Sequence, residues 1–155
     1  VVFFGHDGKL YCIWRMEPVQ IVLELDRAKV VRTWKSKTPE LSYGIPRGGT
    51  QPVPFNGKWL RFCHVNQQNN RSERSYCYHM SAVVMEPEPP FQILRFSDRP
   101  ILTGNEQYFP GHNYWKPKVF YTCGAVPEAD GWRVAIGVND SQCATVKLNE
   151  KDLNL

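Results

Sequence analysis

Residues 47–64 read RGGTQPVPFNGKWLRFCH, and they carry the clearest strand and turn signals in the chain. Asn56-Gly57 separates two segments rich in β-branched and aromatic residues, and Asn-Gly is a strong signal for the turn of a β-hairpin. Arg47 and His64 stand at the outer ends of the two expected strands. Because both ends reach the same rim of a sheet, we expect Arg47 and His64 to form a small cationic site.

The same unit of two strands and a tight turn occurs twice more, around Asp7-Gly8 and around Asp130-Gly131. Further strands are expected in five segments, 19–25, 30–34, 75–85, 91–96 and 142–148. Meandering strands that repeat in this way favour the blades of a β-propeller over a sandwich. The sequence therefore predicts an all-β fold of antiparallel blades, approximately at residues 1–37, 44–102 and 116–150.

The number of blades sets an expectation about partners. Propellers close with about four to eight blades, so three units leave apolar blade faces and strand edges bare. Either further blades lie N-terminal to Val1 in a longer parent chain, or copies of this chain associate as a homo-oligomer. We expect the isolated chain to be oligomeric or prone to aggregation.

The composition excludes several classes of protein. A chain of 155 residues with 42% hydrophobic residues buries a real core, and it has no run of about 18 apolar residues for a membrane span. The net charge of +4 comes from scattered basic residues and not from a stripe, so we expect no nucleic-acid partner.

The cysteines give an expectation about compartment and metal. Five are present, at positions 12, 63, 77, 123 and 143, without the spacing of a zinc site. An odd number without such spacing is typical of buried strand thiols in a reducing compartment. The sequence therefore predicts a cytoplasmic protein without a metal site.

Four segments carry a resemblance to a known family. GIPRGGTQPVPFNGKWLRFCH (44–64), PPFQILRFSDRPIL (89–102) and KVFYTCGAVPEADGWRVAIGVND (118–140) resemble the C-terminal part of the family 130 glycosidases, and FFGHDGKLYCIWRMEP (3–18) resembles the preceding blade. That family contains β-mannoside phosphorylases and related β-mannosidases on a five-bladed β-propeller. The resemblance spans nearly all of this chain but only about the latter half of a family domain, which implies about three of five blades.

The resemblance implies roles for particular residues. His64 matches a histidine that contacts the attacking phosphate in the phosphorylases, and Arg47 could supplement it by bidentate contacts. Asp140 matches an aspartate that faces the sugar. Arg15 and Tyr78 are further substrate-binding candidates, because one ends a strand near the same rim and the other belongs to an alternating set of aromatic residues. Inorganic phosphate is then a co-substrate, and no other cofactor is expected.

Each of these residues also has a purely structural interpretation. Asp140 could form an Asx turn with its neighbour, and His64 could be a hydrogen-bonded histidine at a strand end. Arg47 could pair with Glu40 on the surface, and Tyr78 could pack in the core.

The catalytic residues are not evident. Inverting phosphorolysis needs a general acid that protonates the departing oxygen. In the family this acid is an aspartate on an early blade, and no segment of this chain matches it, so we expect the isolated chain to be inactive. Three functions follow: part of a glycoside-processing enzyme that acts on or binds oligosaccharides, a sugar-transferring relative, or a non-catalytic carbohydrate-binding propeller.

Overall fold

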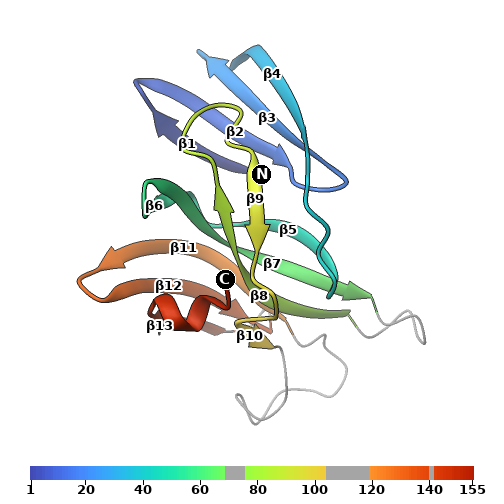
Figure 1. Ribbon diagram of the computed structural model, residues 1–155, viewed down its shortest axis with the longest axis vertical. Helices are drawn as coiled ribbons and strands as arrows, with labels where there is room; N and C mark the ends of the chain where they lie inside the picture. The colour runs from blue at the N-terminus through green and yellow to red at the C-terminus, as the bar shows by residue number, and fades with distance from the viewer. Residues whose placement is uncertain (69–75, 104–118, 140–141) are drawn as a thin grey trace.

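The computed structural model describes residues 1–68, 76–103, 119–139 and 142–155, and this part of the chain is mostly β-strand (Figure 1). Its elements are, in chain order, β1 (Val2–His6), β2 (Lys9–Arg15), β3 (Val19–Asp26), β4 (Lys29–Lys37), β5 (Ile45–Gly49), β6 (Val53–Phe55), β7 (Lys58–Gln68), β8 (Tyr76–Met85), β9 (Ile93–Phe96), β10 (Leu102–Thr103), β11 (Phe120–Glu128), β12 (Gly131–Val138), β13 (Gln142–Leu148) and the 3₁₀ helix η2 (Glu150–Leu153). No helix in the described ranges is long and apolar enough to cross a membrane.

The strands form three antiparallel sheets that lie one above another in Figure 1. The first sheet has the order β1-β2-β3-β4, and the third has the order β11-β12-β13. The middle sheet has the order β10-β8-β7-β5, with β6 paired to β7 and β9 paired to β8. The predicted all-β class is confirmed, and the three meanders have the form of blades from a partial β-propeller.

Two of the predicted tight turns have the expected backbone. Asp7-Gly8 and Asn56-Gly57 have positive φ at both positions, as a type I′ turn requires. The third hairpin differs, because β11 ends at Glu128 and β12 begins at Gly131, so Ala129 and Asp130 make the turn.

The stretch around residue 50 forms two short strands instead of one. The separate strand β5 was not predicted from the sequence, and it pairs with β7 ahead of the hairpin strand β6. At the break, the Thr50 N–H donates to the Phe62 carbonyl oxygen at 2.8 Å, and the Phe62 N–H donates to Thr50 Oγ1 at 3.1 Å. Gly49 has φ +140°, and a Cβ atom there would lie 2.1 Å from the Phe62 oxygen. Only glycine therefore fits where β5 leaves β7.

β7 also extends past its predicted end at His64. It continues to Gln68, because β8 pairs beside it as far as Tyr76. His64 is thus in the middle of a long strand and not at its end.

β7 sends alternate side chains into two different cores. Leu60 and Phe62 are fully buried in the core shared with the third sheet, which includes Trp132 of β12. Cys63 and Val65 are fully buried in the core shared with the first sheet. Each large apolar side chain buried in this way contributes about 1.5–3 kcal/mol to the free energy of unfolding.

Gln20 of β3 joins the first sheet to the middle sheet by hydrogen bonds. Its Nε2 donates to the Phe91 carbonyl oxygen at 2.8 Å, and its Oε1 accepts from the Ile93 N–H at 3.0 Å. Its side chain is 0% exposed, so these bonds form away from water.

The expectation of five buried thiols is wrong for two of them. Cys12 and Cys63 are buried, and Cys77 is half-buried, but Cys123 and Cys143 are exposed. Cys123 lies where the register between β11 and β12 shifts, and a bulge of this kind redirects a side chain. None of the five cysteines forms a disulfide in the described part of the chain, and the cytoplasmic location remains a prediction.

Candidate functional site

His64 lies at the junction of the middle and third sheets, among two tyrosine rings. Its ring centroid is 5.7 Å from that of Tyr78 on β8 and 4.8 Å from that of Tyr121 on β11. The two tyrosine rings are 5.2 Å apart. The Asn66 Nδ2 group donates to the Tyr78 hydroxyl oxygen at 3.4 Å. The structure therefore brings two sequence candidates, His64 and Tyr78, into one aromatic cluster.

The imidazole of this cluster is neutral near pH 7. Burial, together with the positive charges of Arg61 and Arg47, lowers the pKa of His64 to about 4. Its Nδ1 atom is buried and has no hydrogen-bond partner among the described residues. The strand-end part of the structural interpretation is wrong, because His64 lies in the middle of β7. The positive charge expected here comes from arginines, and the imidazole can donate one N–H and accept at its other nitrogen.

Arg47 and Gly48 approach the imidazole from β5. Arg47 is exposed, and no described ion pair joins it to Glu40. A Cβ atom at Gly48 would lie 3.3 Å from His64 Cε1, so the β5 backbone passes close to the ring. Arg47 stands on β5, which pairs with β7, and its positive charge acts on the imidazole of His64. Their joint role in binding phosphate stays a prediction.

A cavity of about 190 Å³ lies on the side of β7 that faces the first sheet, and we call it the arginine cavity. Its lining residues are Val1, Val2, Ile13, Trp14, Arg15, Met16, Glu17, Pro46, Arg47, Gly48 and Arg61. Arg15 and Arg47 therefore share this cavity, whereas His64 is not among its lining residues. Arg15 Nε donates to the Val19 carbonyl oxygen at 3.3 Å.

Arg61 is the functional candidate that the sequence analysis missed. Its side chain is 0% exposed, and its Nε, Nη1 and Nη2 atoms have no hydrogen-bond partner in the part of the chain that the structure describes. Burial lowers the pKa of its guanidinium to about 10, so the group stays charged near pH 7. The sequence does hold a signal for Arg61, because it stands between apolar residues of an expected strand. Arginine is almost never fully buried unless it is paired, so an arginine at a buried strand position indicates a partner.

Asp140 lies outside the described residues, so its role in sugar binding stays a prediction.

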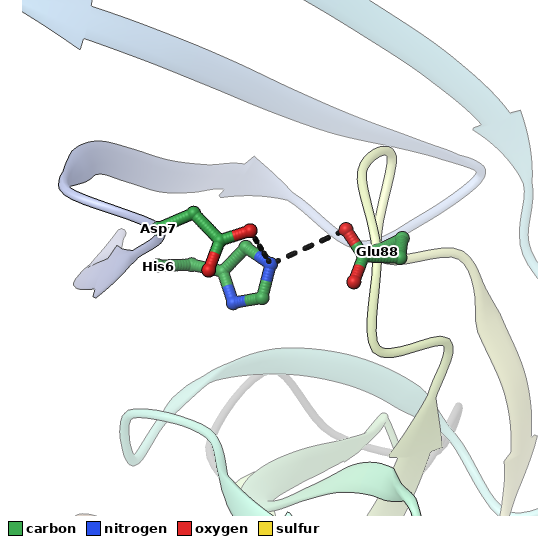
Figure 2. A group of neighbouring side chains, drawn as sticks. All are labelled: His6, Asp7 and Glu88. Carbon is green, nitrogen blue, oxygen red and sulfur yellow. Dashed lines mark hydrogen bonds and ion pairs between the residues drawn. The ribbon is translucent and has the colours of Figure 1, made fainter.

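Further from the arginine cavity, His6 stands between two carboxylates (Figure 2). Its Nε2 atom is 3.4 Å from Asp7 Oδ2 and 3.4 Å from Glu88 Oε2, and both acids are exposed.

The ligand atoms of His6, Asp7 and Glu88 lie close enough together to hold a metal ion. The same contacts also link the β1–β2 turn to the β8–β9 connection without a metal. His6 and Glu88 are 82 positions apart, so sequence spacing could not reveal them. The absence of a metal site stays a prediction.

Comparisons with known proteins place the fold. No family model matches the sequence, and no curated protein matches it. The structure is similar to that of a β-1,2-mannobiose phosphorylase from Listeria innocua, with a TM-score of 0.73 and 20% identity over 98% of this chain and 44% of that chain. It is also similar to a glycosyl hydrolase from Bacteroides ovatus, with a TM-score of 0.69 and 13% identity over 97% of this chain and 48% of that chain.

This chain spans less than half the length of each of the two structures. Over nearly all of its own length, it has the fold of part of these glycoside-processing proteins.

Proposed function

We propose that this chain is part of a glycoside-processing protein that acts on or binds oligosaccharides. The supporting observation is the fold that it shares with a mannobiose phosphorylase over 98% of its residues. A shared fold supports a function only together with the chemistry of a site. Here that chemistry is a neutral imidazole among two tyrosine rings, with the positive charge of Arg47 on the neighbouring strand β5.

The proposed reaction is phosphorolysis of a β-mannoside, with inorganic phosphate bound at Arg47 and His64. A neutral imidazole donates one N–H to a phosphate oxygen, and a guanidinium donates two parallel hydrogen bonds to an oxyanion. Such contacts hold the phosphate for attack on the sugar carbon. Tyr78, Arg15 and Asp140 are the proposed contacts to the sugar, and the ring of Tyr78 offers an apolar face with a polar hydroxyl.

No described residue is assigned as the general acid, so ligand binding and turnover are tested separately. Among the described residues that line the arginine cavity, Glu17 is the one with a carboxyl group. Nothing places its carboxyl group beside a departing glycosidic oxygen, and we expect the chain by itself to bind ligands without turning them over.

The test uses β-1,2-mannobiose and inorganic phosphate, first with this chain and then with the full product of its source gene. We expect the chain to bind phosphate and mannobiose by calorimetry. We expect the full product to release mannose 1-phosphate, measured by chromatography. Phosphorolysis releases one mannose with each mannose 1-phosphate, so release of two mannose molecules and no mannose 1-phosphate would indicate hydrolysis. Sugar binding that is indifferent to phosphate would favour the carbohydrate-binding alternative. If neither protein binds the disaccharide, the proposal fails for mannosides.

The phosphate position has its own test in the double variant Arg47→Ala/His64→Ala. Loss of two contacts to an anion should weaken phosphate binding at least tenfold, since hydrogen bonds to charged groups contribute about 1.5–3 kcal/mol each. Glu40→Ala provides a control, because Glu40 has no described ion pair with Arg47. Unchanged phosphate affinity in the double variant would exclude binding at this position.

A further inference from the structure

We propose that the arginine cavity binds an oxyanion of the phosphate class directly on the buried guanidinium of Arg61. This goes beyond the proposed cleavage of glycosides, because it concerns a residue on the other face of β7 from His64. Alternate residues of a strand point to opposite faces, so Arg61 and Cys63 face the first sheet while Phe62 and His64 face the third. Arg47 also lines the cavity, so His64 and Arg61 are the residues that distinguish the two anion positions.

The first support is the missing partner of Arg61. Its guanidinium is fully buried, and all three of its nitrogens lack a hydrogen-bond partner among the described residues. An ionised group left in this state destabilises the folded protein strongly, and buried polar groups in native proteins nearly always have partners. A partner that is not part of the described chain would remove this cost.

The second support is the path by which such a partner arrives. On β7, Leu60, Phe62 and Cys63 are each 0% exposed around Arg61, and its neighbour across β8, Val83, is also 0% exposed. The surrounding strands thus shield Arg61, which lines the cavity but is 0% exposed, so an anion in the cavity meets the guanidinium once the side chain turns toward that space. A volume of about 190 Å³ equals the liquid volume of about six water molecules, which is enough for a tetrahedral oxyanion and some water.

The third support is the balance of charge. Arg15, Arg47 and Arg61 line the cavity, and Glu17 is the only acidic residue among its described lining. None of the ion pairs in the described part of the chain joins Glu17 to these arginines. Water alone would solvate Arg61 but leave the excess positive charge. An oxyanion neutralises that charge, and its oxygens match the planar fork of a guanidinium better than a spherical chloride does.

Inorganic phosphate and the phosphate group of a sugar phosphate present the same oxygens, so the experiment separates them. The chain is titrated with inorganic phosphate and, in parallel, with mannose 1-phosphate, by calorimetry and by thermal unfolding at matched ionic strength in sodium chloride. We expect saturable binding and a rise in melting temperature with inorganic phosphate. Binding of mannose 1-phosphate alone would assign the site to the ester, and the proposal would hold in that form.

The decisive variant is Arg61→Met, which keeps most of the side-chain length and removes the charge. We expect its melting temperature without ligand to rise or stay the same, because a buried charge without a partner has been removed. We expect its phosphate affinity to fall roughly ten- to hundredfold. The matched control is Arg95→Met, because Arg95 is exposed on β9 of the same sheet and should change neither quantity.

Two results would overturn the proposal. One is the absence of any saturable response of the unaltered chain to phosphate at about 10 mM beyond that of chloride. The other is an Arg61→Met variant that keeps the phosphate affinity of the unaltered chain. If this variant does not fold, Arg61→Lys keeps the charge and loses the fork, and undiminished phosphate affinity in it would equally overturn the proposal. No readout depends on glycoside turnover. Because His64 does not line the cavity, phosphate binding that survives His64→Ala but is lost in Arg61→Met belongs to the arginine cavity, and the reverse pattern belongs to the proposed glycoside site.

Discussion

The protonation state of His64 follows from where its ring lies. Burial between the middle and third sheets removes water from the imidazole, and the nearby guanidinium groups of Arg61 and Arg47 repel a second proton. The ring is consequently a neutral hydrogen-bonding group near pH 7, which suits it to orient a ligand. It does not supply charge.

This environment predicts an acid-sensitive stability. The folded-state pKa of His64 is about 4, whereas its ordinary value is 6.5, so the unfolded chain takes up the proton first as the pH falls. The contribution of His64 to stability is complete above pH 6.5 and is lost as the pH falls toward 4. Urea denaturation at a series of pH values should show this slope, and His64→Gln should reduce it.

His79 provides the accompanying comparison, because burial also lowers the pKa of its imidazole. His79→Gln should remove a further part of the slope, and the double variant should be flatter than either single variant over the same range. An unchanged slope in His64→Gln would show that His64 already titrates near its ordinary value in the folded protein.

At the scale of the element, the exit of β5 from β7 depends on Gly49. In Gly49→Ala, the new methyl group would meet the backbone oxygen of Phe62, which no side-chain rotation relieves. We expect the free energy of unfolding to fall by roughly 3–5 kcal/mol in chemical denaturation. Gly57→Ala is the matched control, because its φ is +71° but nothing lies within 4 Å, and we expect a loss of about 1–2 kcal/mol. Equal losses in the two variants would contradict the steric argument.

A second prediction at this scale concerns the hydrogen bonds that Gln20 of β3 forms with Phe91 and Ile93. Gln20→Leu would leave the Phe91 carbonyl oxygen and the Ile93 N–H buried without their side-chain partner. We expect a loss of roughly 2–5 kcal/mol in the free energy of unfolding, measured by urea denaturation. Gln92→Leu, an exposed change beside the same strand, should stay within about 0.5 kcal/mol. A Gln20→Leu variant as stable as this control would show that water replaces the lost bonds.

At the scale of the whole molecule, the first sheet has an apolar outer face. Phe3 is 58% exposed and Leu10 is 44% exposed, and both lie on the face opposite to the core that contains Phe4 and Tyr11. An apolar face of this kind tends to be covered by another surface. In a longer chain that surface would be a further blade, and in the isolated chain it would be a second copy.

We therefore expect light scattering to detect dimers or larger species of the isolated chain. The double variant Phe3→Lys/Leu10→Lys should shift the distribution toward monomers, because charges oppose the burial of that face. Leu94→Lys on the middle sheet serves as the control, since Leu94 is 39% exposed but lies away from this face. A monodisperse monomer of the unaltered chain would contradict the expectation.

The sequence by itself determined the features that depend on neighbouring residues. Asp7-Gly8 and Asn56-Gly57 fold into tight turns because those residue types accept positive φ, and the alternation of side chains sets the all-β class. Arg27 and Ala28 also form a turn with positive φ, but this turn contains no glycine or asparagine from which it could have been predicted. The same local signals singled out Arg15, Arg47 and His64, which stand in strands beside or close to the arginine cavity.

Only the tertiary structure decided the features that depend on residues far apart in the chain. Three features arise from packing between segments that are distant in the sequence, and no local pattern predicts them. They are the separate pairing of β5 with β7, the burial of Arg61 between two sheets, and the approach of Glu88 to His6. Charge states follow the same rule, because burial and neighbouring charges set a pKa, and both exist only once the sheets are packed.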